Sequence, residues 1–175
     1  QFSLLQVVAL AMADMLSEYG IEAKIKWTND IYVGDRKLVG ILMEHKLQGA
    51  AIGRTIAGIG LNVNQTEFDP ELPNPTSMRL IAGREFDRKE VLERIALHLK
   101  NRYEMLRRGE IKQLHLDYHQ RLYRLGEEHT YALPDGTRFR GVIEGVEPQG
   151  ALKITTPQGE AYKFLFKEVE FVLKN

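Results

Sequence analysis

The sequence contains no cysteine, which excludes disulfide bonds and thiolate chemistry from all 175 residues. A chain without cysteine is compatible with a reducing compartment, and we expect a cytoplasmic protein. There is no net charge either, because Lys plus Arg and Asp plus Glu number 24 each. No net field therefore draws this chain to nucleic acid or to an anionic membrane. No apolar run approaches the roughly 18 residues of a membrane-spanning helix, and no signal peptide, internal repeat or low-complexity segment is visible.

The composition, 43% hydrophobic and 27% charged, is ordinary for one or two soluble globular domains with a substantial core. The character of the sequence changes at Gly126. Upstream, helical patterns flank strand-like runs. Downstream, Pro-x-Gly turns precede or separate short strand patterns at 138–146, 151–155, 160–166 and 168–173. We therefore predict an α+β fold in two domains. Residues 1–125 would form a mixed or antiparallel sheet packed with helices, and residues 126–175 a small β-barrel.

Four helices are predicted by apolar periodicity and by capping residues. The first covers residues 2–19, begins with a capping box of Ser3 and Gln6, and is apolar enough to pack on more than one side. The other three span 78–82 (capped by Thr76 or Ser77), 88–108 (capped by Asp87) and 111–125. His115 and His119 share one face of the last helix, but no third ligand is evident, so we predict no metal site there.

The stretch from Lys24 to Asn64 reads as a series of strands separated by short turns. Strand patterns at 23–27, 31–33, 38–45 and 50–59 are separated by Asn29-Asp30, Gly34-Asp35 and Gly49. Strands joined by such short turns are antiparallel neighbours. We therefore expect the polar end of the first strand to approach the glycines that end the last one, which would form a candidate site.

Three blocks of this stretch resemble the biotin protein ligases in both order and spacing. The blocks are Lys26–Asp30 (KWTND), Arg36–Glu44 (RKLVGILME) and Gly58–Asn64 (GIGLNVN). One such block is a weak signal, but three in order are specific. There are two departures from the family pattern. Thr28 stands where the family usually has proline, and the family's glycine- and arginine-rich biotin-binding loop, which lies upstream of these blocks, has no counterpart here. We therefore expect the chain alone to be inactive.

The resemblance implies that residues 1–125 are the C-terminal portion of a ligase catalytic domain and that residues 126–175 form a Src-homology-3-like barrel. It also implies an ATP-dependent enzyme that activates biotin to biotinyl-5'-AMP and transfers the biotinyl group to a lysine of a biotin carboxyl carrier domain. The implied ligands are biotin, ATP and Mg2+. The implied partner is the carrier protein or domain of acetyl-CoA carboxylase or a related carboxylase, with no membrane or nucleic acid, and a homodimer stays open.

Five residues carry the chemistry that the resemblance implies. Lys26 would bridge the biotin carboxylate and the α-phosphate of ATP, because two anions must be neutralised before they can react. Gly58 and Gly60, which lack β-carbons, would wall the biotin pocket together with Leu61. Asn62 offers an amide that can both donate to adenine and accept from it.

These assignments have alternatives. On the sequence alone, Lys26 is more simply an exposed strand lysine, and the glycines a β-bulge. Asp30 could help to place magnesium, but with Trp27 and Asn29 it more often only shapes a turn, and Lys37 is a weaker candidate for phosphate contact. For the function, the alternatives are a non-catalytic carrier-binding or self-association module and, less favoured, a lipoate ligase-like enzyme.

Overall fold

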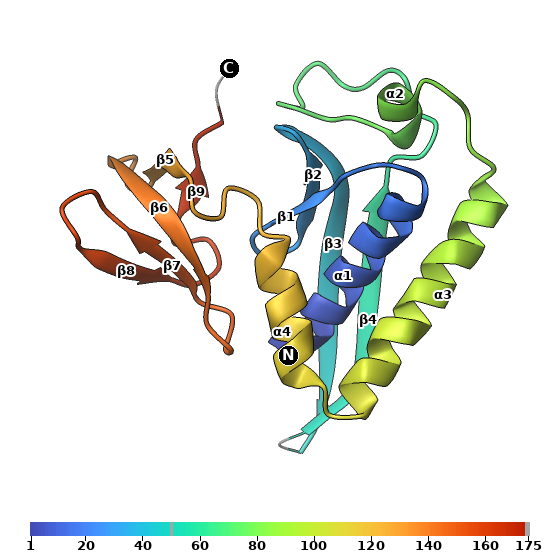
Figure 1. The fold of residues 1–175 in the computed structure, drawn as a ribbon, viewed down its shortest axis with the longest axis horizontal. Helices are drawn as coiled ribbons and strands as arrows, with labels where there is room; N and C mark the ends of the chain where they lie inside the picture. Colours follow the sequence, from blue (N-terminus) through green and yellow to red (C-terminus); the bar gives the residue numbers. More distant parts are fainter. Residues whose placement is uncertain (50, 174–175) are drawn as a thin grey trace.

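The structure, a computed structural model, describes residues 1–49 and 51–173 and confirms an α+β fold built on two antiparallel sheets (Figure 1). In chain order the elements are α1 (Phe2–Glu18), β1 (Lys24–Lys26), β2 (Asp30–Val33), β3 (Arg36–Gln48), β4 (Ala51–Leu61), α2 (Met78–Ala82), α3 (Arg88–Arg107), α4 (Ile111–Gln120), β5 (Glu128–Ala132), β6 (Arg138–Val146), β7 (Leu152–Thr155), β8 (Ala161–Phe164) and β9 (Glu170–Phe171). We call the part up to α4 the first unit and the part from β5 onwards the second unit.

The sheet of the first unit has the strand order β1-β2-β3-β4, and each neighbouring pair is antiparallel, as predicted. Strands β3 and β4 form a longer hairpin than predicted, since β3 reaches Gln48 and β4 continues to Leu61. The predicted start of β4 at Ala50 lies outside the described residues. Helices α1, α3 and α4 lie over one face of this sheet (Figure 1). No helix of the described residues covers the opposite face, which leaves that face free to hold a site.

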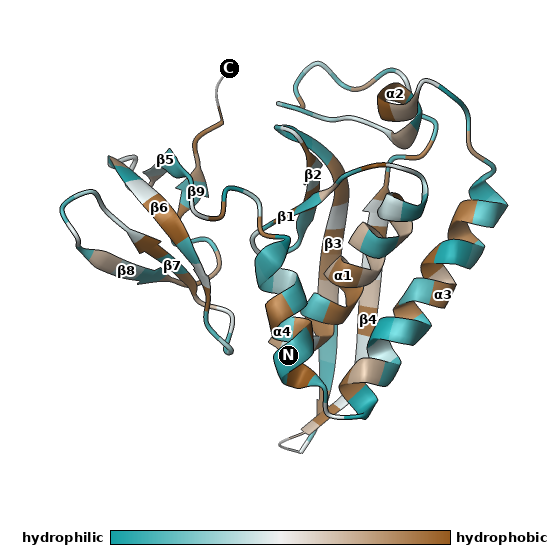
Figure 2. Cartoon of the chain, viewed as in Figure 1, coloured by the Kyte–Doolittle hydropathy of each residue, from teal (hydrophilic) through white to brown (hydrophobic). Residues whose placement is uncertain are grey.

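Helix α1 contacts the sheet on one side and helices α3 and α4 on another. Its side chains from Gln6 to Ala13 are all buried, so the predicted packing on more than one side is confirmed. Helix α3 is amphipathic by contrast, and Figure 2 shows hydrophobic and hydrophilic residues alternating along its ribbon. None of the helices in the described chain is long and apolar enough to cross a membrane.

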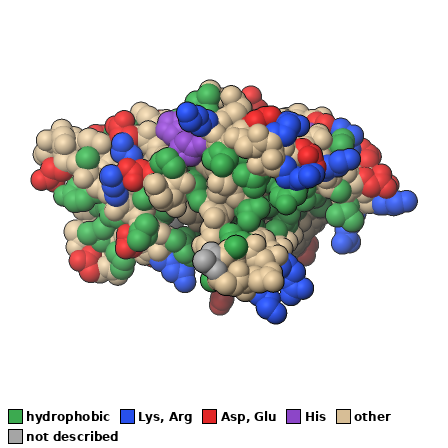
Figure 3. All heavy atoms as spheres, turned by 90° about the horizontal axis from the view of Figure 1, so that it is seen from below, with side chains coloured by type: hydrophobic (Ala, Val, Ile, Leu, Met, Phe, Trp, Pro, Cys, Tyr) green, Lys and Arg blue, Asp and Glu red, His purple; other side chains and the backbone are tan. Residues whose placement is uncertain are grey.

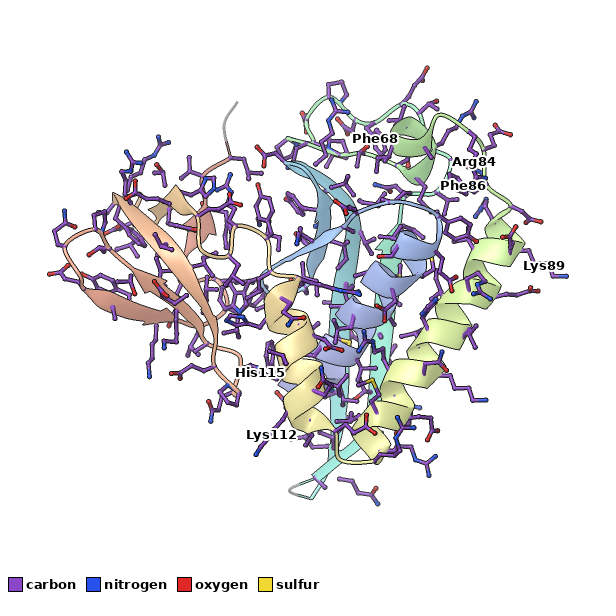
Figure 4. All side chains as sticks on the ribbon, in the orientation of Figure 1. Phe68, Arg84, Phe86, Lys89, Lys112 and His115 are labelled. Carbon is purple, nitrogen blue, oxygen red and sulfur yellow. The ribbon has the colours of Figure 1, made fainter. Side chains whose placement is uncertain are left out.

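The predicted capping box of α1 is wrong. The helix begins at Phe2, and the carbonyl of Gln1 accepts from Leu4 N at 3.1 Å, so Ser3 lies inside the first turn and caps nothing. Gln6 is buried and its amide lies 2.9 Å from Nδ1 of His115 in α4, the helix on which Figure 4 labels that residue. A long-range partner therefore uses the side chain that the capping box would have needed.

The caps predicted for α2 and α3 are confirmed. Ser77 Oγ accepts from Leu80 N at 3.2 Å, and an Asp87 carboxylate oxygen accepts from Lys89 N at 2.8 Å. These local hydrogen bonds satisfy N–H groups that a helix start leaves without a partner, which is why sequence alone locates them.

Helix α4 ends at Gln120, five residues before the predicted end at Leu125. The residues that follow pair with β1 instead. Ile25 N donates to Arg121 O at 2.7 Å, and Tyr123 N donates to Ile25 O at 2.9 Å. The chain between the two units is therefore fixed along the edge of the first sheet.

Arg102 of α3 ties together the three large helices. Its guanidinium contacts Asp14 of α1 at 2.6 Å and also pairs with Asp117 of α4, and its side chain is only 13% exposed. Burial by itself would raise the pKa of Asp14, but the hydrogen bond from Arg102 and the charges of Arg121 and Arg102 hold it below the usual 3.8. The half-buried carboxylate therefore depends on these cations.

We expect Arg102→Met to lower the free energy of unfolding by about 2 kcal/mol at neutral pH, because it removes an ionic partner from each of two carboxylates of low exposure. Arg107→Met is the matched control on the same helix, since Arg107 is 63% exposed and pairs with Glu104 at the surface. It should cost less than about 0.5 kcal/mol. Urea denaturation measures both. Because the pKa of Asp14 is depressed, this stabilisation is present above pH 3.8 and is lost as the pH falls through the folded-state pKa. Equal losses in the two variants would contradict this account.

The second unit is a five-stranded antiparallel sheet in the order β8-β7-β6-β5-β9, which fits the predicted Src-homology-3-like β module. The turns predicted near Gly136, Gly150 and Gly159 are each closed by a backbone hydrogen bond. Strand β8 ends at Phe164, before the predicted end at Phe166, because Leu165 N bonds to the Glu168 carboxylate in a turn. The sequence prediction did not include β5.

Side chains and backbone join the two units. Trp27 Nε1 donates to the carbonyl of Gly150 at 2.9 Å, and His119 Nε2 lies 3.0 Å from the carbonyl of Glu144. The ring of His119 also covers Gly145, whose φ is +142°; a Cβ there would lie 1.9 Å from Nε2. The docking of the second unit therefore requires glycine at this position.

We propose that residues 1–125 and 126–175 are separate folding domains, as the change of sequence pattern predicts. Deletion of everything after Leu125 should then leave a folded but less stable remainder, because the helices and the first sheet keep their own core while the Trp27 hydrogen bond is lost. Hydrogen exchange measures this directly. A remainder without protected amides in α1 would show instead that the chain is one cooperative unit.

Candidate functional site

Four residues from the four strands of the first sheet, among them the predicted site residues Lys26 and Gly60, form one row across it. Lys26 pairs with Asp30, Asp30 with Gly40, and Gly40 with Gly60. Side chains alternate between the faces of a strand, and the adjacent Ile25 is fully buried. The row therefore lies on the face opposite the helices, and the expected meeting of the polar end of β1 with the glycines of β4 is confirmed by the register.

The glycines make a floor without side chains. Gly58 lies opposite Leu42 and Gly60 opposite Gly40, and an open hollow of about 510 Å³ lies above them. Neither glycine has a positive φ, and both lie within regular pairing of β3 and β4. The alternative of a β-bulge at these glycines is therefore wrong. What they provide is space for the backbone to approach a ligand.

An ion pair covers one end of this floor. Lys37 Nζ lies 2.8 Å from an Asp30 carboxylate oxygen. A Cβ on Gly40 would lie 3.3 Å from Lys37 Cε, so the glycine leaves room for this lysine to lie across the sheet. Lys37, a weaker candidate for phosphate contact on the sequence alone, thus lines the hollow above the glycines directly.

Lys26 lies beside this hollow, in a neighbouring cleft of about 580 Å³ between the two units. Its ammonium is 5.3 Å from the ring centre of Tyr32 and 4.8 Å from that of Phe171. Burial lowers the pKa of Lys26, and the nearby Asp30 carboxylate opposes that effect. The alternative of a freely exposed strand lysine is therefore wrong. Asp30 lines both the cleft and the hollow and connects them.

Asn62 and Leu61 have roles in the fold as well. The Asn62 amide donates to Thr76 O at 2.9 Å, and its residue lines a hollow of about 490 Å³ that it shares with Gly60 and Lys37. Leu61 packs against the core, on the side of β4 opposite Gly60, so its side chain does not line the site. The amide oxygen of Asn62 has no protein partner among the described hydrogen bonds, which leaves it able to accept from a ligand.

The loop from Gln65 to Pro75 encloses this hollow from the side. Lys37 N donates to Asn74 O at 2.8 Å and Thr76 N donates to Lys37 O at 2.9 Å, so the loop returns along the start of β3. Phe68, labelled in Figure 4, lies on this loop at the same end of the sheet as α2. Pro70, Pro73 and Pro75 are typical of a loop, but they carry no signal that this loop lines the site.

A separate hydrophobic groove of about 620 Å³ lies between α1, α3 and the β3–β4 hairpin. Figure 3 looks at the molecule from below and shows hydrophobic side chains gathered across the middle of this face, with charged side chains of both signs around them. The two histidines of α4 contact different residues: His115 lies against Gln6, and His119 against the carbonyl of Glu144. No group of three or more histidines and carboxylates that could hold a metal occurs within residues 1–49 and 51–173.

Comparison with known proteins gives concordant results. Residues 2–64 match the model of the "Biotin/lipoate A/B protein ligase family". The "Bifunctional ligase/repressor BirA" of Bacillus subtilis is 32% identical over 162 residues, which cover 91% of this chain and 49% of the relative. The "Biotin--[acetyl-CoA-carboxylase] ligase" of Mycobacterium tuberculosis is 29% identical over 144 residues, 81% of this chain and 51% of the relative. The chain thus spans about half the length of these curated relatives.

A solved structure shares the fold over almost the whole chain. The biotin protein ligase from Aquifex aeolicus in complex with biotin and ATP matches with a TM-score of 0.80 and 26% sequence identity. The match covers 98% of this chain and 72% of that one, so both units and their arrangement have a counterpart in it.

Proposed function

Because this chain belongs to the biotin/lipoate A/B protein ligase family, we propose that it forms the part of a biotin protein ligase in which biotin and ATP react. The resemblance seen in three blocks of the sequence is confirmed by the comparisons. In the proposed reaction, a biotin carboxylate oxygen attacks the α-phosphorus of ATP and pyrophosphate leaves. The amine of a carrier lysine then attacks the acyl carbon of biotinyl-5'-AMP, and AMP leaves.

The observation that carries this proposal is the row of Lys26, Asp30, Gly40 and Gly60. It places a floor without side chains, suited to a flat ligand, beside two lysine ammonium groups. A carboxylate and a polyphosphate repel each other, and fixed cations are the direct means of lowering that barrier. Lys26 would neutralise the carboxylate and the α-phosphate, while Lys37, released from Asp30, would meet another anionic oxygen.

The ligands that we propose are biotin, ATP and Mg2+. Magnesium that accompanies ATP takes most of its ligands from phosphate oxygens and water, so it needs few from the protein. Asp30, the carboxylate of the row, would supply one. The acetyl-CoA carboxylase in the name of the Mycobacterium tuberculosis relative suggests a biotin carboxyl carrier domain as the acceptor.

The test is biotin-dependent exchange between ATP and labelled pyrophosphate, measured with the full gene product. We expect exchange with biotin and not with lipoate, followed by biotinylation of one lysine in an added carrier domain. Exchange with lipoate alone would favour a lipoate ligase-like enzyme. Binding of the carrier without any exchange would favour the non-catalytic module.

A further inference from the structure

The second unit contributes a side chain that touches the key lysine of the first. Phe171 belongs to β9, yet its ring centre lies 4.8 Å from Lys26 Nζ, closer than that of Tyr32 on the adjacent strand at 5.3 Å. Both rings face the same ammonium. A cation held over aromatic faces is attracted by their electron density, and the attraction grows when water is excluded.

The Phe171 ring is held in place by its surroundings. Tyr131 lies edge-on at 5.3 Å and Tyr123 is stacked at 6.3 Å. The backbone is fixed as well, since Tyr131 pairs with Phe171 in the β5–β9 ladder and Arg124 donates to Val172 O at 3.1 Å. Lys26, with its flexible side chain, is therefore the mobile member of the contact, and the rings determine where its ammonium rests.

Charges of both signs surround Lys26. Asp30 from β2 and Glu170 from β9 attract the ammonium, whereas Lys37 from β3 and Arg124 from the segment after α4 repel it. Burial is the largest influence and lowers the pKa of Lys26. The aromatic rings thus provide the directional contact in a site whose charges oppose one another.

We propose that Phe171 is a positioning residue for Lys26, and that through it the second unit controls the orientation of the ammonium that meets the biotin carboxylate and the α-phosphate. The contact itself does not depend on the function of the chain. Its consequence for adenylate formation rests on the function proposed above.

The first experiment measures the contact without relying on activity. Lysines of the full gene product are labelled with 13C by reductive methylation, and the pH midpoint of each is followed by NMR. We expect Phe171→Leu, which keeps an apolar side chain but removes the ring, to lower the midpoint of Lys26, because the charged form loses its partner. Phe171→Tyr should restore it. The matched control is Phe166→Leu, which removes a ring that faces Lys167 in the same cleft and should leave Lys26 unchanged.

The second experiment measures adenylate formation with the same variants, without methylation. Phe171→Leu should lower kcat by about tenfold with little change in the KM for biotin, because it misplaces a group that acts in the transition state. Phe171→Tyr and Phe166→Leu should remain near the unchanged protein. If Phe171→Leu loses its native melting transition, Phe171→Met replaces it, because methionine adapts better to the space left by a ring.

The outcomes separate the two proposals. If the Lys26 midpoint and kcat in Phe171→Leu match those of Phe166→Leu, Phe171 does not position Lys26 and the inference is overturned. If the midpoint moves but even the unchanged protein forms no adenylate, the contact stands and the proposed function fails. A fall in both the midpoint and kcat, restored by tyrosine, supports the whole inference.

Discussion

Lys26→Met should slow biotinyl-adenylate formation by about 100-fold or more in the full gene product, since removing one charge contact from a transition state commonly has that effect. Methionine keeps the apolar stem of the side chain against Tyr32 and Phe171 and removes only the ammonium. The melting temperature should therefore stay close to that of the unchanged protein. Single-turnover release of pyrophosphate measures the loss.

Lys24→Met is the matched control for this experiment. Lys24 lies two positions earlier on β1, on the same face of the sheet, and is exposed. Its replacement should leave the rate within about twofold, because an exposed cation outside the site is screened by water and salt. Near-normal turnover in Lys26→Met, or equal losses in the two variants, would remove Lys26 from the mechanism.

Gly145→Ala should destabilise the protein by about 3 kcal/mol or more, the largest stability effect that we expect for a single methyl group. The added Cβ would lie 1.9 Å from His119 Nε2, at a residue whose φ of +142° already disfavours any side chain. Either the ring of His119 or the whole second unit must then move. Urea denaturation, followed by tryptophan fluorescence from Trp27 at the junction of the units, measures the change.

Two further variants assign the cause. Gly136 also has a positive φ, +85°, but a Cβ there would meet nothing within 4 Å, so Gly136→Ala should cost only about 1–2 kcal/mol. In a protein that already carries His119→Ala, Gly145→Ala should lose most of its excess cost. Strict additivity of the two changes would mean that the contact with His119 is not the source of the effect.

The sequence predicted those features that depend on neighbours along the chain. Ser77 and Asp87 cap their helices through hydrogen bonds to N–H groups two or three residues away, so a local pattern suffices to find them. The row through Lys26 and Gly60 could be predicted from the sequence for a related reason, because short turns fix antiparallel pairing. The early end of α4 could not be predicted, because Arg121 and Tyr123 bond to Ile25 on a strand that is distant in the sequence.

The residues missed at the site are those that the fold brings from far away. Phe171 and Asn74 reach the neighbourhood of Lys26 from β9 and from a proline-rich loop, and neither carries a motif. The direction of the Leu61 side chain could have been predicted from the sequence, because side chains alternate along a strand and Leu61 therefore points to the side opposite Gly60. Resemblance to a family assigned Leu61 to the pocket, whereas the strand geometry directs its side chain to the core.

The pairing of Arg121 and Tyr123 with Ile25 lowers the affinity that the contact between Phe171 and Lys26 needs. Ile25 is the residue next to Lys26, so the chain that leads into the second unit is anchored beside its target. Because the connection between the two units is short and paired with the sheet, the Phe171 ring has a high effective concentration at the Lys26 ammonium. The contact therefore needs little affinity of its own, and a longer, unpaired connection would leave the same ring in place for a smaller part of the time.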